Sequence, residues 1–255
     1  MSGKVDFAGK KCIVTGAGRG IGRAIVTELH ARGAKVYAVT KNPVNLQKLV
    51  EDCPGVIPVR ADLSNAEEIK NVIEPIEAVD VLINNAGVCE PSAVMDISGD
   101  SCDRIFSVNL KAVLQISQIV ARKMIEKGDG GSILNVSSVS GIQPLPYIGV
   151  YACSKTAVNT LTKMFAVELG PHKIRVNAIA PAIVATDMTS MRTYVPDASE
   201  TDIPPPLQGM LARTPTNTYN MPMSDIVNTA LFLVSNQTSQ LTGQVLAVDG
   251  GYLAH

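Results

Sequence analysis

The chain has 255 residues, and its 22 Lys and Arg against 23 Asp and Glu give a formal net charge of −1. So even a balance argues against nucleic acid or an anionic membrane as a partner, because proteins that bind either carry a basic excess. The composition, 46% hydrophobic and 18% charged, is that of a globular domain and excludes a disordered chain.

Signals for targeting and for metal binding are missing from the sequence. No apolar segment approaches the roughly 18 residues of a membrane span, and charged residues among the first eleven argue against a secretory signal. The five cysteines show no CxxC spacing and the three histidines are isolated, so we expect no metal site. These features predict a cytoplasmic protein with free thiols.

Strands and helices alternate along the whole chain. Apolar runs predict strands at residues 11–15, 36–39, 56–59, 79–83, 132–136, 174–179 and 245–248. Helical patterns with end signals predict helices at 20–32, closed by Gly33; after a capping box at 64–67; and at 103–126, 150–169 and 224–234, the last capped by Ser224. This order predicts a single α/β domain over residues 1–255, a doubly wound parallel sheet of about seven strands with helices on both faces.

Residues 188–222 depart from this alternation. The stretch contains six prolines and has no clear period. Because so long an irregular loop in a compact domain usually has a function, we expect it to form a lid over a site.

A glycine-rich turn, TGAGRGIG at residues 15–22, joins the first predicted strand to the first helix. Glycines allow the backbone to approach a pyrophosphate, and the helix that follows points its N–H groups at the anion. An ordinary tight connection would also use glycine, but the strand before it and the helix after it are the context that this motif requires. The turn predicts a dinucleotide site with contacts from Gly16, Gly20, Ile21 and Gly22.

The second strand indicates which dinucleotide binds. An NAD enzyme usually carries an acidic residue about 20 residues past the glycines, where it bonds the ribose 2′-OH. Here the strand ends in Thr40 and Lys41, and the next acidic residue is Glu51. Lys41 and Arg19 could pair with a 2′-phosphate, although both could equally be solvated surface cations. The missing acid and the two cations together predict NADP(H).

Tyr151 and Lys155 lie four residues apart near the start of a predicted helix. That spacing places both side chains on one helix face, where a lysine cation favours the phenolate and lowers a tyrosine pKa from about 10 towards neutral. Tyr151 could then exchange a proton with a carbonyl or an alcohol. The pattern alone is common: Tyr37 and Lys41 share it, but on a strand, where four residues span about 13 Å.

Other polar residues are candidates for the same site. Ser138, after the fifth strand, could hydrogen-bond a substrate oxygen or simply satisfy a nearby backbone group. Residues 84–87 (NNAG) close the fourth strand, where Asn and Gly also suit an ordinary turn. Asn109 falls inside the helix predicted at 103–126. Since Asn is a poor helix former, it indicates either an exposed position or a distortion that presents a polar group to the site.

Taken together, these motifs resemble the classical short-chain dehydrogenase/reductase family, which has a Rossmann-type fold. The resemblance runs from about Phe7 to Leu253 and rests on the order and separation of TGAGRGIG (15–22), Asp62-Leu63, NNAG (84–87), Asn109, Ser138, YxxxK (151–155) and residues 181–186. Within that family the chain is similar to the NADPH-dependent dicarbonyl/L-xylulose reductases, in stretches such as LHARGAKVYAVTKN (29–42) and ELGPHKIRVNA (168–178).

The resemblance implies a role for each matching residue. Tyr151 would be the general acid in carbonyl reduction, Lys155 would hold the nicotinamide ribose, Ser138 would steady the carbonyl oxygen, and Asn109 would hold a proton-relaying water. The remaining cofactor contacts would come from Thr40, Asp62, Leu63, Asn85, Ala86, Gly87, Pro181, Ile183 and Thr186. Family members commonly form homotetramers, so the resemblance also implies a second copy of the chain as a partner.

The residues expected around the substrate are apolar or uncharged. Beside Ser138 and Tyr151 they are Gln143, Leu145, Ile148, Met188 and Met191. They offer no cation for a carboxylate or phosphate, so they favour a small neutral carbonyl compound, a sugar or a diketone, although similar residues also line steroid and acyl pockets. The resemblance thus implies an NADPH-dependent reductase of α-dicarbonyls and L-xylulose.

Two alternatives stay open. A reductase of 3-oxoacyl or steroid ketones would use the same four residues on a different substrate. A non-catalytic NADP(H)-binding sensor or scaffold would keep the fold, but it has no need of Asn109, Ser138, Tyr151 and Lys155 together. Cys153 should lie on another helix face in a structural role, the alternative being an oxidation-sensitive thiol near the site.

Overall fold

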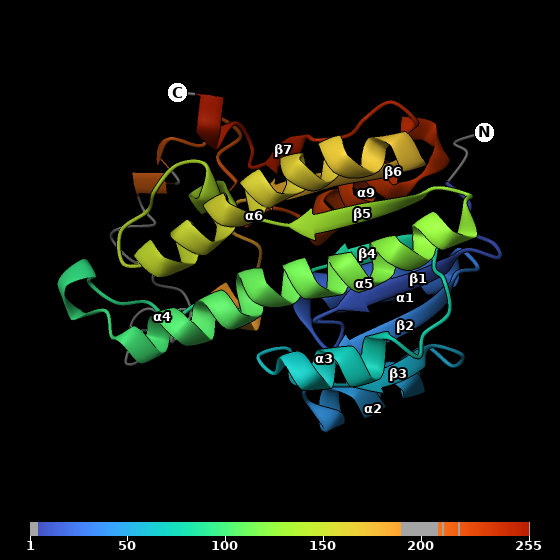
Figure 1. Ribbon diagram of the computed structural model, residues 1–255. Coiled ribbons are helices and arrows are strands. Elements are labelled where there is room, and N and C mark those ends of the chain that lie inside the picture. Colours follow the sequence, from blue (N-terminus) through green and yellow to red (C-terminus); the bar gives the residue numbers. More distant parts are fainter. Residues whose placement is uncertain (1–4, 190–208, 211, 219, 255) are drawn as a thin grey trace.

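Seven parallel strands form one sheet in the computed structural model, in the order β3-β2-β1-β4-β5-β6-β7 (Figure 1). The strands are β1 (Lys11–Thr15), β2 (Lys35–Thr40), β3 (Ile57–Arg60), β4 (Val81–Asn84), β5 (Gly131–Val136), β6 (Ile174–Pro181) and β7 (Val245–Val248). The structure describes residues 5–189, 209–210, 212–218 and 220–254. All seven predicted strands are present, which confirms the Rossmann-type doubly wound sheet.

Helices cover both faces of the sheet, as predicted. The helices are α1 (Gly20–Ala31), α2 (Pro43–Asp52), α3 (Ala66–Ile73), α4 (Gly99–Phe106), α5 (Ala112–Lys127), α6 (Gly149–Leu169) and α9 (Met223–Val234). Successive residues of a strand point to opposite faces, so Cys12 and Val14 of β1 join the core under α1 and α9, while Ile13 joins the core under α3, α5 and α6. In Figure 1, α5 and α6 cross in front of the sheet. No helix of the described residues is both long and apolar enough to cross a membrane.

The strand order reverses between β1 and β4, which pair with each other in the middle of the sheet. In an open α/β sheet the loops after the carboxyl ends diverge at such a point and leave a crevice. The glycine turn follows β1 and the NNAG segment follows β4, so the crevice opens between these two motifs.

The long helix predicted at 103–126 is instead divided into three parts. α4 is followed by a π-helical segment, Ser107–Lys111, and then by α5. A π-helical turn is rare and costs helix stability, and here it contains Asn109, whose side chain is fully buried. Of the two interpretations that the sequence allowed for Asn109, the structure therefore supports the distortion.

Helix α2 was not predicted, although the sequence carries its start signal. The side chain of Asn42 accepts hydrogen bonds from the backbone N–H groups of Val44 and Asn45, at 2.9 and 3.1 Å, and Pro43 occupies the first helical position. The helix is short, and Leu46 and Leu49 are its only buried residues, so its apolar periodicity is weak.

Two predicted helix starts were wrong by one or two residues. The N-cap of α3 is Asn65, not Ser64: Asn65 accepts from the N–H groups of Glu67 and Glu68, because Ser64 is bonded to Asp62 instead. Helix α9 begins after Pro222, so Ser224 lies inside the helix and its side chain does not cap it.

We predict that Gly22→Ala destabilises the protein by about 1–3 kcal/mol, the usual cost of overpacking. Gly22 lies in α1, and a Cβ there would collide with the carbonyl oxygen of Gly16 and the side-chain amide nitrogen of Asn85. Gly99→Ala is the matched control, since it also lies in the first turn of a helix but an added Cβ meets nothing within 4 Å. Chemical denaturation of both variants checks this. Equal stability of the two variants would contradict the crowding.

Candidate active site

A cavity of about 1230 Å³ lies at the carboxyl edge of the sheet. It is larger than the 300–1,000 Å³ typical of a site for one small ligand, so it has room for a dinucleotide and a second molecule. Of the expected cofactor residues, the structure places these along its wall: Gly16, Arg19, Gly20, Ile21, Thr40, Lys41, Asp62, Leu63, Asn85, Ala86, Gly87, Tyr151, Lys155, Pro181, Ile183 and Thr186. Gly22 is not part of the wall, and it serves the packing of α1 instead.

The glycine turn leaves its backbone open towards the cavity. Gly16 has a φ of +65° and a Cβ there would lie 2.8 Å from the Cα of Ala86, so only glycine fits. The side chain of Asn85 donates to the carbonyl oxygens of Thr15 and Gly16, at 3.0 and 3.3 Å. Asn85 therefore uses its amide to fasten the turn to the β4 loop. This cradle, which a Cβ would fill, fits the pyrophosphate of a dinucleotide.

At the other end of the cradle, both predicted phosphate-binding cations are paired with carboxylates. Lys41 lies 2.6 Å from Asp62, and Arg19 donates to Asp187 at 2.9 Å. The Lys41 ammonium lowers the pKa of the Asp62 carboxyl to about 2. These four side chains lie at the rim of the cavity, and Arg19 and Asp187 are mostly exposed, so water and a charged ligand can reach them.

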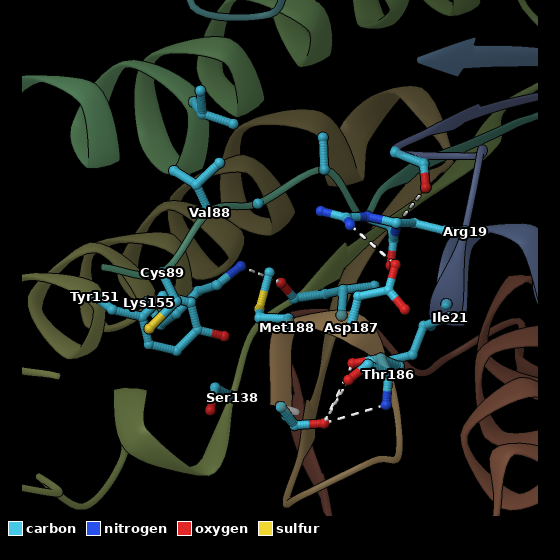
Figure 2. A pocket seen from close by; sticks show the side chains of 18 of the residues that line it. Arg19, Ile21, Val88, Cys89, Ser138, Tyr151, Lys155, Thr186, Asp187 and Met188 are labelled. Carbon is cyan, nitrogen blue, oxygen red and sulfur yellow. Dashed lines mark hydrogen bonds and ion pairs between the residues drawn. The ribbon is translucent and has the colours of Figure 1, made fainter. Parts of the chain in front are cut away.

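Tyr151 and Lys155 project from the first turns of α6 into the cavity (Figure 2). The Nζ of Lys155 lies 5.6 Å from the centre of the Tyr151 ring and donates to the carbonyl oxygen of Val136 at 2.7 Å. Burial lowers the pKa of Lys155 to about 8, because the charged form loses its hydration. Figure 2 shows Ser138 and Cys89 grouped with this pair, with Arg19 and Ile21 at the far end of the view.

Ser138 lines the cavity where β5 ends, and its oxygen already accepts two hydrogen bonds. They come from the backbone N–H of Ser140 at 3.2 Å and from the Ser140 hydroxyl at 2.9 Å. A hydroxyl oxygen with two donors is polarised to donate its own proton. The Ser138 hydroxyl can therefore donate to an oxygen in the cavity.

Asn109 is not part of the cavity wall. Its side chain lies behind the wall and bonds to two of the segments that form it. Its Oδ1 accepts from the N–H of Val88 at 2.8 Å, and its Nδ2 donates to the carbonyl oxygen of Val88 at 2.9 Å and to Ser154 at 3.0 Å. The π-helical turn thus clamps the β4 loop to α6, and Asn109 holds in register the two segments that carry Gly87 and Lys155.

The expected substrate residues are only partly brought together. Leu145, Ile148 and Met188 line the cavity beside Ser138 and Tyr151. Gln143 does not: its side-chain oxygen faces Arg213, at 2.9 and 3.2 Å from the two terminal nitrogens once the amide is oriented by its hydrogen bonds. Met191, and residues 190–208 of the expected lid, lie outside the described residues.

Sequence reasoning missed several residues of the cavity wall. Cys89, Glu90, Arg104, Tyr147 and Met210 all line it. Glu90 and Arg104 are charged, whereas an uncharged surround was expected. The two residues are far apart in the sequence and no local pattern connects them, so only the packing of α4 against the β4 loop reveals the pair.

All five cysteines are described and none forms a disulfide. Cys153 is exposed and is not part of the cavity wall, which agrees with its expected place on another helix face. The thiol at the cavity is Cys89. Burial raises the pKa of Cys89 to about 12, so it is a neutral thiol and a weak nucleophile at neutral pH.

The sequence profile of the short chain dehydrogenase family matches residues 10–194 of the chain. The chain belongs to this family. It is 44% identical over 250 residues to L-xylulose reductase from Mus musculus, with 98% of this chain and 99% of that protein covered. Identities are 41% to carbonyl reductase [NADPH] 2 from Sus scrofa and 38% to D-erythrulose reductase from Gallus gallus, with 99% of each protein covered.

Solved structures agree with this assignment. A putative NAD(P)-dependent gluconate 5-dehydrogenase from Beutenbergia cavernae, with bound NADP, superposes with a TM-score of 0.88 at 32% identity, covering 99% of this chain and 100% of that one. Carveol dehydrogenase from Mycobacterium avium, in complex with NAD, gives the same TM-score at 29% identity and the same coverage. The chain is thus an oxidoreductase that acts on CH–OH and carbonyl groups.

We predict that the buried Lys155 ammonium gives the free enzyme a distinct pH dependence. Folding lowers the pKa of Lys155 from 10.5 to about 8, so between these values the unfolded chain binds more protons and stability rises with pH. The unfolding free energy of the wild type relative to Lys155→Met should rise by about 2 kcal/mol between about pH 7.5 and 9.5.

Denaturant titrations across this pH range measure the difference. Lys163→Met removes an exposed lysine from the same helix, and its difference from the wild type should stay flat. A flat difference for Lys155→Met as well would mean that Lys155 is well solvated.

Proposed function

We propose that the protein is an NADPH-dependent carbonyl reductase that reduces α-dicarbonyls and L-xylulose, forming xylitol from the latter. The observation that carries the proposal is the placement of Tyr151 and Lys155 from one helix at a cavity that also holds the glycine cradle. The names of the relatives, L-xylulose reductase and carbonyl reductase [NADPH] 2, support the substrate and the cofactor.

The residues present fit NADP(H). The cradle formed by Gly16 and Gly20 would hold the pyrophosphate, and Gly87, where a Cβ would lie 3.5 Å from the Nζ of Lys155, leaves space for the nicotinamide ribose. Arg19 and Lys41 would exchange the carboxylates of Asp187 and Asp62 for the 2′-phosphate. The exchange costs little, because both cations are exposed and ion pairs of exposed groups contribute at most about 1 kcal/mol.

Each residue then has a chemical task. A reduced nicotinamide, when bound at this edge, would supply the hydride for the carbonyl carbon. Tyr151 donates a proton to the carbonyl oxygen, and the nearby Lys155 ammonium favours the phenolate that remains. The Ser138 hydroxyl, with both acceptor sites filled by Ser140, donates to the same oxygen and holds it in place. Asn109 keeps the β4 loop and α6 at a fixed separation.

A homotetramer agrees with the surface of the chain. Met164 and Val167 on α6 are 52% and 75% exposed, and Phe232 on α9 and Leu246 on β7 are 42% and 43% exposed. These side chains lie on two different parts of the molecule. Two separate apolar contacts between copies are what a tetramer with twofold symmetry requires.

The function is tested by following NADPH consumption by the purified protein with diacetyl, L-xylulose, a 3-oxoacyl thioester and a ketosteroid, with NADH in parallel. We expect reduction of diacetyl and L-xylulose, and a preference for NADPH. Turnover of only the thioester or the steroid would contradict the proposed substrates. Binding of NADPH without any turnover would favour a sensor.

Tyr151→Phe should lower kcat by at least about a hundredfold, the typical contribution of a general acid, because the variant loses the hydroxyl of the ring that lies beside the Lys155 ammonium. NADPH binding, measured by fluorescence titration, should change less than about twofold because the variant keeps the ring. Thr156→Val, which removes a hydroxyl on the same helix that is bonded to backbone carbonyl oxygens, serves as the control. Wild-type turnover by Tyr151→Phe would rule out this mechanism.

A further inference from the structure

The wall of the cavity contains a fixed ion pair. Arg104 of α4 holds Glu90 of the β4 loop with two hydrogen bonds, from Nε to Oε1 at 3.0 Å and from Nη2 to Oε2 at 2.8 Å. The hydroxyl of Ser101 donates to Oε2 at 2.7 Å. Both charged residues line the cavity. Two-point pairing of a guanidinium with a carboxylate fixes the orientation of both groups.

The loop that carries Glu90 is itself held in place. Asn109 clamps Val88 from behind, and the N–H of Ser92 donates to the carbonyl oxygen of Tyr147 at 2.7 Å. Tyr147 has a φ of +65°, a strained value for tyrosine, and it also lines the cavity. A loop secured on both sides of Glu90 can act as a fixed recognition element.

The loop that carries Glu90 is anchored to the helix of Tyr151 and Lys155. On one side of Glu90, Asn109 joins the loop to α6; on the other, Ser92 is bonded to the segment that leads into α6. Val88, Val108 and Ile148, which line the same cavity, are apolar. Glu90 and Arg104 thus place charged groups of both signs in a wall that also carries apolar side chains.

The pair still has hydrogen-bonding capacity. Of the five N–H groups of a guanidinium, two are used on Glu90, and a carboxylate has about four acceptor positions, of which three are used here. Donors and acceptors thus stand side by side, which is the pattern that an alcohol group matches, since it both donates and accepts. Because the two charges cancel, the pair gives no advantage to a carboxylate.

We propose that Glu90 and Arg104 bind the hydroxyl groups of a neutral polyhydroxy ketone, and that they select such a substrate over a plain diketone. The proposal rests on the proposed function and extends it, because it assigns sugar recognition to two residues. A diketone of diacetyl's size reaches Tyr151 but has no hydroxyl for the pair.

The test compares two substrates in the same enzyme. For the wild type, Glu90→Gln and Arg104→Met, kcat/KM is measured with L-xylulose and with diacetyl at saturating NADPH. The ratio of the two values should fall about tenfold in each variant, the typical effect of losing a hydrogen bond to a charged group. Asp103→Asn removes an exposed carboxylate from the same helix, and it should leave the ratio as in the wild type.

A change in the ratio separates recognition from general damage. If the variants lose activity on both substrates equally, the pair only holds the loop and the proposal is overturned. A ratio within about twofold of the wild type in both variants also overturns it.

A binding measurement keeps the site testable without turnover. Xylitol is titrated into the NADPH-bound enzyme by calorimetry, with 2,3-butanediol as the comparison; neither alcohol can react there, because no hydride acceptor is present. Xylitol should bind the wild type and bind each variant about tenfold more weakly. If the wild type reduces neither L-xylulose nor diacetyl, the proposed function is wrong. The titration then still tests whether Glu90 and Arg104 bind hydroxyl groups. Equal xylitol affinity in all three proteins would overturn the proposal.

Discussion

The hydrogen bonds from Asn85 to the glycine turn are the contact on which the site depends. They join the loops after β1 and β4 at the point where the strand order reverses, and they leave no space for a side chain at Gly16 or Gly22. The β4 loop and the start of α6 are placed relative to this junction. The β4 loop continues to Val88, which Asn109 binds, and Asn109 in turn contacts Ser154 on α6. The glycine cradle and the helix that carries Tyr151 are thus joined by one series of hydrogen bonds.

The second constraint is a buried cation. Lys155 is nearly inaccessible to water and is held by the carbonyl oxygen of Val136 at the end of β5. Desolvation destabilises the charged form of Lys155, so the pKa of its ammonium group is lower than that of a solvated lysine. A cation in this state stabilises nearby negative charge more strongly than a solvated one would. The same burial that costs stability therefore serves the chemistry proposed for Tyr151.

Charge at both ends of the cavity is arranged in pairs. Arg19 and Lys41 are balanced by Asp187 and Asp62 at one end, and Arg104 is balanced by Glu90 at the other. The pairs differ in geometry. The first two are single contacts at an open rim, suited to exchanging a carboxylate for another anion, whereas the third is a two-point pair fixed by a further hydroxyl. This difference agrees with the exchange proposed for a 2′-phosphate and with the recognition proposed for hydroxyl groups.

Local patterns in the sequence were enough to predict the strands, the glycine turn and the pair on α6, because each depends on neighbours within a few residues. Apolar runs mark buried parallel strands, and a spacing of four places Tyr151 and Lys155 on one helix face. Asn42 and Pro43 are a local start signal for α2 as well. The helix was not predicted because its apolar periodicity is weak. The break at Asn109 was visible only as a poor helix former, since the π-helical turn depends on Val88, 21 residues away.

Other features of the site could be recognised only in the folded structure, because the residues that form them are distant in the chain. Gln143 has no local reason to turn away from the cavity, and Arg213, which it faces, lies 70 residues further on. Glu90 and Arg104 form a pair only because α4 packs beside the β4 loop, and Lys41 and Arg19 receive acidic partners from separate loops. Spacing along the chain determines which groups share an element. The contacts between elements arise from packing, and they determine which charges meet and which side chains face the substrate.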